Sequence, residues 1–256
     1  MIAPAPIGPV RPRSLASSLC DARSGLGLAL WWLLVTAGGQ SASAQVSAGA
    51  AFTSDYQYRG ISLSDGRPAL SLSISYDHRS GVYAGGAVVG GTTPRNGLQV
   101  LGVEAYLGYA RRFRSADTLD IGVSHRSARQ FYYSVYTISD TEIYAGLHKG
   151  HFSYYLYYSP RYYGSRNQTL YADVAGSLRP APRWRVFGHI GVLTPLQAPA
   201  RPGAYLERYD FKIGLAREFR GGEVQLAWTP TLPDRNYRLG RSQEHDALVF
   251  TASHGF

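Results

Sequence analysis

Strict alternation of apolar and polar residues is the feature that most constrains the fold of this chain. From Leu70 to Tyr76, four apolar residues alternate with three serines. Successive side chains of a β-strand point to opposite faces, so this segment has one apolar face and one polar face. The pattern returns from Tyr209 to Leu215, where Asp210 and Lys212 take polar positions. Repeated segments of this kind predict an all-β fold, a transmembrane antiparallel up-and-down β-barrel with lipid outside and a polar lumen.

We expect about twelve strands, an even number that places the first and last strand ends at the same rim. The predicted strands are residues 46–56, 68–76, 82–89, 98–109, 118–125, 141–148, 151–158, 170–178, 184–192, 209–219, 223–229 and 247–256. Ten or fourteen strands remain open, because Val82 to Val89 is rich in glycine and Thr194 to Arg208 is long enough for a further hairpin. Short connections alternate with longer ones, which is typical of barrels with short periplasmic turns and long outer loops.

Tyrosine is abundant in the chain, with 20 residues. Its apolar ring and polar tip suit the aromatic girdles at the two membrane interfaces. We expect girdle positions in four adjacent pairs, Tyr132-Tyr133, Tyr154-Tyr155, Tyr157-Tyr158 and Tyr162-Tyr163. A secreted soluble β-sandwich is the alternative fold, since alternation alone does not identify which face meets lipid.

Residues 1–44 have the features of a secretory signal peptide. Three arginines precede an apolar stretch from Leu26 to Val35, and Ala42-Ser43-Ala44 offers a small-residue cleavage site before Gln45. A transmembrane helix is the alternative, but the apolar stretch is shorter than the roughly 20 residues that cross a bilayer. We therefore expect cleavage near Ala44 and a barrel from residues 45 to 256, which contain no cysteine and hence no disulfide.

The first part of the predicted barrel resembles a known family. The residues that carry the resemblance are Phe52 to Tyr56, Tyr58 to Ser62, Pro68-Ala69 and Gly81 to Gly85. Together they are similar to the opening signature of the Gcw_chp family, a group of uncharacterised proteobacterial outer-membrane proteins. The resemblance implies an outer-membrane β-barrel and supplies no catalytic residue or cofactor. The ending at Phe256, in phase with Phe250, resembles the C-terminal signal by which such barrels are recognised for insertion.

The net charge of the chain is +9, a value that by itself suggests nucleic acid or an anion channel. The distribution argues against both, because the predicted strands carry three basic residues against eight acids and the excess arginine lies in loops and turns. Arginine on outer loops can pair with the phosphates of lipopolysaccharide. The alternative is that it only keeps the rims hydrated. The candidate lipopolysaccharide contacts are Arg59, Arg67, Arg126, Arg129, Arg161 and Arg166.

Charged residues within the strands fall mostly at polar positions of the alternation, so we expect them to line the lumen. The candidates are Glu104, Asp120, Glu142, Asp173, Arg185, Asp210, Lys212 and Glu223. Acids outnumber bases in this set, so a conducting barrel should prefer cations mildly. The counter-hypothesis is that the acids pair with basic residues and tyrosine hydroxyls and fill the interior. A twelve-stranded barrel lies between small filled barrels and large open ones, so both remain open.

An enzyme is the remote alternative. His125 and Ser127 share the lipid side of a predicted strand near an outer loop, an arrangement that resembles that of lipid A deacylases, in which histidine activates a serine nucleophile. Ala128 departs from that pattern, which has asparagine there, so we expect no catalytic activity. The seven histidines are scattered without metal-ligand spacing. We therefore expect no metal, no cofactor and no nucleic-acid partner.

The sequence thus favours a small passive outer-membrane pore with a mildly acidic lumen. A non-conducting structural barrel, or one that binds lipopolysaccharide, is the alternative. The expected partners are outer-membrane lipids and lipopolysaccharide, the barrel-assembly machinery and small solutes. Alternation and loop lengths cannot identify a solute, because they describe the wall and not the passage.

Overall fold

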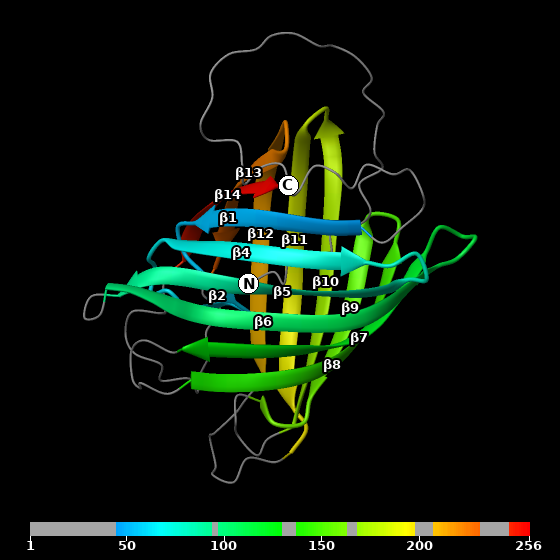
Figure 1. Cartoon of the computed structure of the whole chain (residues 1–256), viewed down its shortest axis with the longest axis horizontal. Helices are drawn as coiled ribbons and strands as arrows, with labels where there is room; N and C mark the ends of the chain where they lie inside the picture. The colour runs from blue at the N-terminus through cyan, green and yellow to red at the C-terminus, as the bar shows by residue number, and fades with distance from the viewer. Residues whose placement is uncertain (1–44, 94–96, 130–136, 163–167, 198–206, 231–245) are drawn as a thin grey trace, which may run out of the picture. The chain divides into compact units, whose positions relative to one another are not determined.

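The computed structural model describes residues 45–93, 97–129, 137–162, 168–197, 207–230 and 246–256 (Figure 1). Twelve strands form a closed barrel in which every pair of neighbours is antiparallel. They are β1 (Gln45–Thr53), β4 (Ala69–Asp77), β5 (Val82–Thr93), β6 (Gly97–Arg112), β7 (Thr118–Arg129), β8 (Thr137–Lys149), β9 (Phe152–Ser159), β10 (Thr169–Ala181), β11 (Trp184–Pro195), β12 (Arg208–Phe219), β13 (Gly222–Thr229) and β14 (Ala247–Gly255). Two further strands, β2 (Gln57–Tyr58) and β3 (Ile61–Ser62), form a separate hairpin. The prediction of a twelve-stranded barrel is confirmed, and the predicted signal peptide lies outside the described residues.

Short and long connections alternate between the strands. At one rim the turns are short, as at residues 150–151 between β8 and β9. At the other rim the connections are longer, as at residues 54–68 between β1 and β4. The exception is the connection of β5 to β6, which spans only residues 94–96 because both strands extend further than the sequence pattern predicts. None of the described residues belongs to a helix long and apolar enough to cross a membrane.

The two faces of the wall have the predicted polarities. On β4, Leu70, Leu72 and Ile74 point outward and are 51%, 52% and 58% exposed. On β12, Ile213 is also exposed on the outside, whereas Asp210 is buried inside. An outward apolar surface that continues around a closed barrel is suited to lipid and unsuited to water. This polarity favours a membrane barrel over the soluble sandwich.

Tyrosine and glycine pair across strands inside the barrel. An added Cβ at each of these glycines would overlap the ring of a tyrosine on the neighbouring strand. The pairs are Tyr83 with Gly108, Tyr144 with Gly122, and Tyr155 with Gly146. The missing side chain lets the ring lie against the sheet, so a narrow lumen can hold several large aromatic residues. This packing accounts for part of the tyrosine and glycine content of the chain.

The predicted aromatic girdle is partly wrong. Tyr155 and Tyr162 are buried inside the barrel, with 8% and 6% of their surface exposed, whereas Tyr154 points outward and is 43% exposed. Adjacent residues of a strand face opposite sides, so a tyrosine pair within a strand can place only one ring in lipid. Tyr132, Tyr133 and Tyr163 lie outside the described residues.

Replacing Gly146 with alanine should destabilise the barrel, because the new Cβ would force the Tyr155 ring away from the wall and from its hydrogen bond to Asp120. Overpacking of this kind lowers the free energy of unfolding by about 1–3 kcal/mol. Urea-induced unfolding from lipid vesicles measures the loss. Gly90→Ala is the matched control, since the nearest atom to its added Cβ lies 3.7 Å away. Equal losses in the two variants would contradict the packing argument.

The barrel closes between its first and last strands through its shortest ladder. β1 and β14 share five register pairs, from Gly49–Gly255 to Thr53–Thr251, whereas β1 and β4 share nine. Backbone hydrogen bonds between Ala48 and Phe256 extend the seam at one end. The Phe256 side chain is 76% exposed, and its role as an insertion signal stays a prediction.

Candidate functional site

The connection from Asp55 to Arg67, which we call the lumenal segment, folds into the barrel. Its two short strands are joined by a two-residue turn in which Arg59 and Gly60 have φ angles of 47° and 76°. Two positive φ angles are typical of the turns in tight hairpins. An added Cβ at Gly60 would lie 2.9 Å from the Cβ of Asp210 on β12. The tip of the hairpin therefore touches the wall, and the prediction of an outer loop at residues 57–67 is wrong.

An apolar cluster holds the lumenal segment against one side of the wall. Tyr56, Tyr58 and Leu63 of the segment belong to the cluster. Its wall residues are Ala69, Val89, Leu101 and Ala128. Leu101 is 1% exposed and lies at a register shift between β5 and β6. Such a bulge re-aims one side chain, and here it adds an apolar residue to the packing of the segment.

Asp55 organises the start of the lumenal segment through four hydrogen bonds. Its Oδ1 accepts from Ser62 Oγ at 2.5 Å, from Ser64 Oγ at 3.0 Å and from the Gly66 backbone N–H at 3.2 Å. Its Oδ2 accepts from Gln57 Nε2 at 2.7 Å. Four donors satisfy this buried carboxylate. The segment is therefore a built element of the fold.

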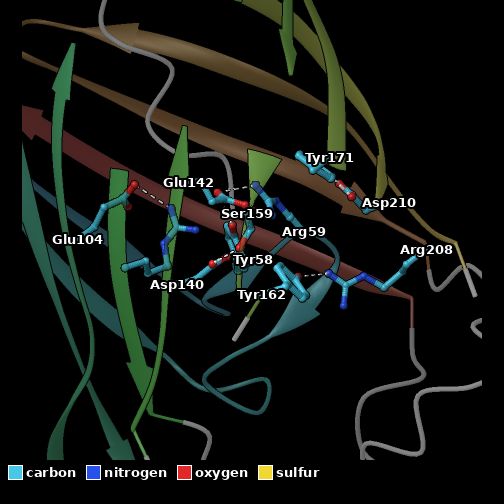
Figure 2. Close-up of polar contacts among 11 residues, drawn as sticks. Tyr58, Arg59, Glu104, Asp140, Glu142, Ser159, Tyr162, Tyr171, Arg208 and Asp210 are labelled. Carbon is cyan, nitrogen blue, oxygen red and sulfur yellow. Dashed lines mark hydrogen bonds and ion pairs between the residues drawn. The ribbon is translucent and has the colours of Figure 1, made fainter. Parts of the chain in front are cut away.

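Arg59 reaches across the lumen to the wall formed by β8, β9 and β10 (Figure 2). Its Nη1 donates to Oε1 of Glu142 at 2.7 Å, and its Nη2 donates to Oε2 at 2.8 Å. Its guanidinium carbon lies 3.9, 5.3 and 4.8 Å from the ring centroids of Tyr171, Tyr157 and Tyr58. We call Tyr58, Glu142, Tyr157 and Tyr171 the Arg59 cage. Arg59 is 3% exposed, so a bidentate ion pair and three aromatic rings hold this cation away from water.

Arg126 makes a related contact beside the Arg59 cage. Its Nη2 donates to Oε1 of Glu104 at 2.7 Å, and its guanidinium carbon lies 3.9 Å from the ring centroid of Tyr58. The predicted lipopolysaccharide contacts of Arg59 and Arg126 are therefore wrong. Both side chains are buried inside the barrel and paired with carboxylates.

The other four candidate lipopolysaccharide contacts stay predictions. Arg161 is exposed and Arg67 is half-buried, both near the rim of long connections. Arg129 ends β7, and Arg166 lies outside the described residues.

Strands β10, β11 and β12 carry a second polar group. His189 Nδ1 forms a hydrogen bond with Asp173 at 2.6 Å, and its Nε2 forms one with Asp210. The Tyr171 hydroxyl donates to the two carboxylate oxygens of Asp210 at 3.2 and 3.1 Å. Tyr171 thus connects this group to the Arg59 cage. Lys212 lies at the next inward position of β12.

Asp120 is the centre of a third group and is 2% exposed. Its Oδ1 accepts from the Tyr83 hydroxyl at 2.5 Å, and its Oδ2 accepts from the Tyr155 hydroxyl at 2.7 Å. The hydroxyls of Tyr83 and Tyr144 are 2.6 Å apart, and His148 Nε2 lies 2.7 Å from the Tyr155 hydroxyl. Each carboxylate oxygen has a phenol donor, which offsets the cost of burying the group.

All eight candidate lumen residues lie on the inward face of the wall. Besides the groups above, Arg185 on β11 pairs with Glu223 on β13 at 2.5 Å. Most of the acids thus bond a base or a phenol, as the counter-hypothesis of a filled interior expects. The sequence pattern missed two buried residues near the starts of strands, Asp140, which bonds Ser159, and Arg208, which donates to the Tyr162 hydroxyl at 3.3 Å (Figure 2).

Among the inward residues named in this subsection, acids outnumber bases by eight to five without histidine. The acids are Asp55, Glu104, Asp120, Asp140, Glu142, Asp173, Asp210 and Glu223, and the bases are Arg59, Arg126, Arg185, Arg208 and Lys212. Three of these bases, Arg59, Arg126 and Arg208, were predicted in loops. The acidic excess is therefore smaller than the strand assignment predicted.

The described residues give little support to the enzyme alternative. His125 and Ser127 share the outward face of β7, but the Nδ1 of His125 lies 2.8 Å from the Thr141 hydroxyl on β8. The imidazole is therefore engaged with a neighbouring strand. Within the described ranges, no group of three or more His, Cys, Asp or Glu side chains could hold a metal ion.

The chain is similar in fold to outer-membrane porins. A family model described as a bacterial protein of unknown function (Gcw_chp) matches residues 36–256. A NanC porin superposes with a TM-score of 0.53 at 10% identity, over 83% of this chain and 99% of that chain. An outer membrane channel from Pseudomonas putida F1 gives 0.47 at 11% identity, over 85% and 97% of the two chains. A KdgM porin in complex with disordered oligogalacturonate gives 0.44 at 10% identity, over 82% and 95%. No curated protein matches the chain.

Proposed function

The chain belongs to the Gcw_chp family of bacterial proteins of unknown function, and we propose that it is a narrow outer-membrane channel for small solutes, constricted by its own lumenal segment. The observation that carries the proposal is the burial of Arg59 against Glu142, inside a closed barrel whose outer face is apolar. A segment that crosses the lumen and is anchored on the far side narrows any passage through it.

The side of the lumen next to β1 and β4 supports a remaining passage. Its inward positions carry small residues, among them Ser47, Gly49, Ser71, Ser73 and Ser75. Ser73 points inward and is nevertheless exposed, which indicates that water reaches the middle of this wall. The inward tyrosines and ion pairs described above lie on strands other than β1 and β4, so small residues, most of them serines, line the open part.

Arg59→Ala should enlarge the passage and increase its preference for cations. The change removes the anchor of the lumenal segment and leaves the carboxylate of Glu142 without its guanidinium partner. Removing one partner of a buried ion pair costs about 3–5 kcal/mol, which favours release of the segment. Single-channel recording in planar bilayers, with a potassium chloride gradient for the reversal potential, measures both effects.

Arg67→Ala is the matched control, because Arg67 ends the same segment near the rim and is partly exposed. We expect it to leave the conductance close to that of the wild type. Equal conductance in the Arg59→Ala variant and the wild type would contradict a constriction at Arg59. A barrel that carries no current in any form would support the non-conducting alternative.

Three further assignments belong to this proposal. Residues 1–44 are a signal peptide removed near Ala44, Phe256 is recognised by the barrel-assembly machinery, and the exposed Arg161 meets the phosphates of lipopolysaccharide. N-terminal sequencing of protein extracted from the outer membrane tests the first assignment. The expected first residue is Gln45, and an intact Met1 would contradict cleavage.

A further inference from the structure

Arg59 occupies a position that resembles a ligand-binding site. Glu142, Tyr157 and Tyr171 of the Arg59 cage belong to the adjacent wall strands β8, β9 and β10. Tyr171 and Tyr157 are also held by other wall residues, because the Tyr171 hydroxyl bonds Asp210 and the ring centroid of Tyr157 lies 5.6 Å from that of Tyr144. The two rings would stay in place if the lumenal segment moved, and Glu142, which bonds Tyr58 and Arg59 of the segment, would remain on the wall strand β8 with its carboxylate released. Arg59 enters the cage from a separate segment, as a ligand would.

We infer that the wall residues of the Arg59 cage, Glu142, Tyr157 and Tyr171, form a binding site for the guanidinium group of a solute and that Arg59 fills it when no solute is bound; this inference rests on the proposed channel function. Glu142 accepts two parallel N–H bonds, at 2.7 and 2.8 Å. A planar guanidinium offers such a fork, whereas an ammonium group is a point charge. Tyr171 covers one face of the cation with its ring at 3.9 Å. The site therefore recognises charge and planarity together.

The backbone at Arg59 supports this reading. Its φ of 47° lies in the left-handed region, which a residue with a Cβ seldom adopts. The turn itself would favour asparagine or glycine at this position. A non-glycine residue persists in such a conformation where its surroundings hold it there. Here the surroundings are the Arg59 cage. The fit of the side chain into this cage explains the presence of arginine at position 59 better than the geometry of the turn does.

A solute guanidinium would compete with Arg59 for the same carboxylate. The acidic excess in the lumen attracts such a cation. Because one group can occupy the Glu142 oxygens at a time, binding of the solute displaces Arg59 and releases the lumenal segment. A ligand that binds only the released state shifts the population toward it. The substrate class is thus small solutes with a guanidinium group on a flexible chain, such as arginine.

The test uses the Arg59→Ala barrel, whose cage is vacated, and methylguanidinium as the probe. We expect methylguanidinium to block the current of this variant in planar bilayers with a half-maximal effect at about 1 mM, typical of one small charged site. Methylammonium lacks the planar fork and urea lacks the charge. Both should need concentrations higher by about tenfold or more. Equal potency of the three probes would overturn the inference.

The double variant Arg59→Ala with Glu142→Gln is the matched control. It keeps the tyrosines and removes the carboxylate, so the response to methylguanidinium should weaken by about tenfold or more. The wild type should also respond more weakly, because Arg59 fills its cage. Equal responses of the single and double variants would overturn the inference. Arg59→Gln replaces Arg59→Ala if the alanine variant does not fold.

Thermal unfolding in detergent gives a second readout that needs no current. Methylguanidinium should raise the Tm of the Arg59→Ala variant and leave that of the double variant unchanged, since a ligand stabilises only the form that binds it. A silent barrel with this Tm shift would refute the channel and support the binding site. A conducting barrel with neither block nor Tm shift would refute the binding site and support the channel.

Discussion

Excision of the lumenal segment, with Ser54 joined to Pro68 through a short glycine–serine link, is expected to increase the single-channel conductance severalfold. The wall should survive, because β1 and β4 pair directly up to Thr53 and Ala69. The excision removes the three segment residues of the apolar cluster and the Arg59 anchor at once, so it should widen the passage more than Arg59→Ala does. Planar-bilayer recording measures the conductance, and urea unfolding from vesicles shows whether the wall is intact.

The outcome also locates the constriction. A folded barrel without the segment that conducts no better than the wild type would place the narrowest point elsewhere, with the Asp120 group as the next candidate. In that case Asp120→Asn should change the current while Arg59→Ala does not. A large increase in both segment variants, with no change in Arg67→Ala, would assign the constriction to Arg59.

Leu72→Arg should destabilise the barrel strongly, because Leu72 is an exposed residue in the middle of the outward face of β4. An arginine on the lipid face near the middle of the bilayer costs about 2–4 kcal/mol in a transmembrane barrel. Urea unfolding from vesicles of defined lipid measures the loss. The same substitution in detergent should cost less, since detergent adapts more readily to a charge.

Ser73→Arg is the matched control, on the next residue of the same strand and on the opposite face. Ser73 is exposed toward the lumen, so water can solvate the new charge and the free energy of unfolding should change little. The added side chain should instead lower the conductance. Equal destabilisation by the two substitutions would contradict the assignment of lipid to the outer face and water to the inner one.

The wall of the barrel could be predicted from the sequence because the signal for each strand lies in neighbouring residues of that strand. Each strand alternates over several residues, as β4 does between Leu70 and Tyr76, and a period of two specifies which face is apolar. Strand ends were predicted less well. The strand that begins at Thr118 was predicted to end at His125, but it continues to Arg129. Arg126 therefore lies within β7 and points inward, whereas the shorter predicted strand placed Arg126 in a loop.

The lumenal segment could not be predicted because its strands have two residues each, too few for periodicity to register. The one local signal is Arg59-Gly60 between two short pairs, which is compatible with a tight turn. The inward direction of the lumenal segment depends on residues that are distant in the chain. Glu142, the partner of Arg59, is 83 residues away in the chain. Alternation predicted that Glu142 faces the lumen, but alternation carries no information about which residue contacts Glu142 there.

The residues that carry the family resemblance acquire a physical meaning in the structure. Asp55, Tyr58, Arg59 and Gly60 build the lumenal segment, its turn and its anchor. Their side chains do not form the wall, so alternation would not require them. Part of the resemblance thus lies in the segment that distinguishes the lumen from a plain pore, and the rest lies in or beside the wall strands β1, β4 and β5.

The short seam between β1 and β14 has a consequence for biogenesis. Thr53 and Thr251 meet across it although they are 198 residues apart in the chain, so ring closure is the longest-range contact of the fold and one of the last able to form. Until then, both terminal strands expose unpaired backbone edges, which are templates for aggregation. A delay between synthesis and membrane entry should therefore increase the aggregation of this protein more than a substitution within a completed hairpin does.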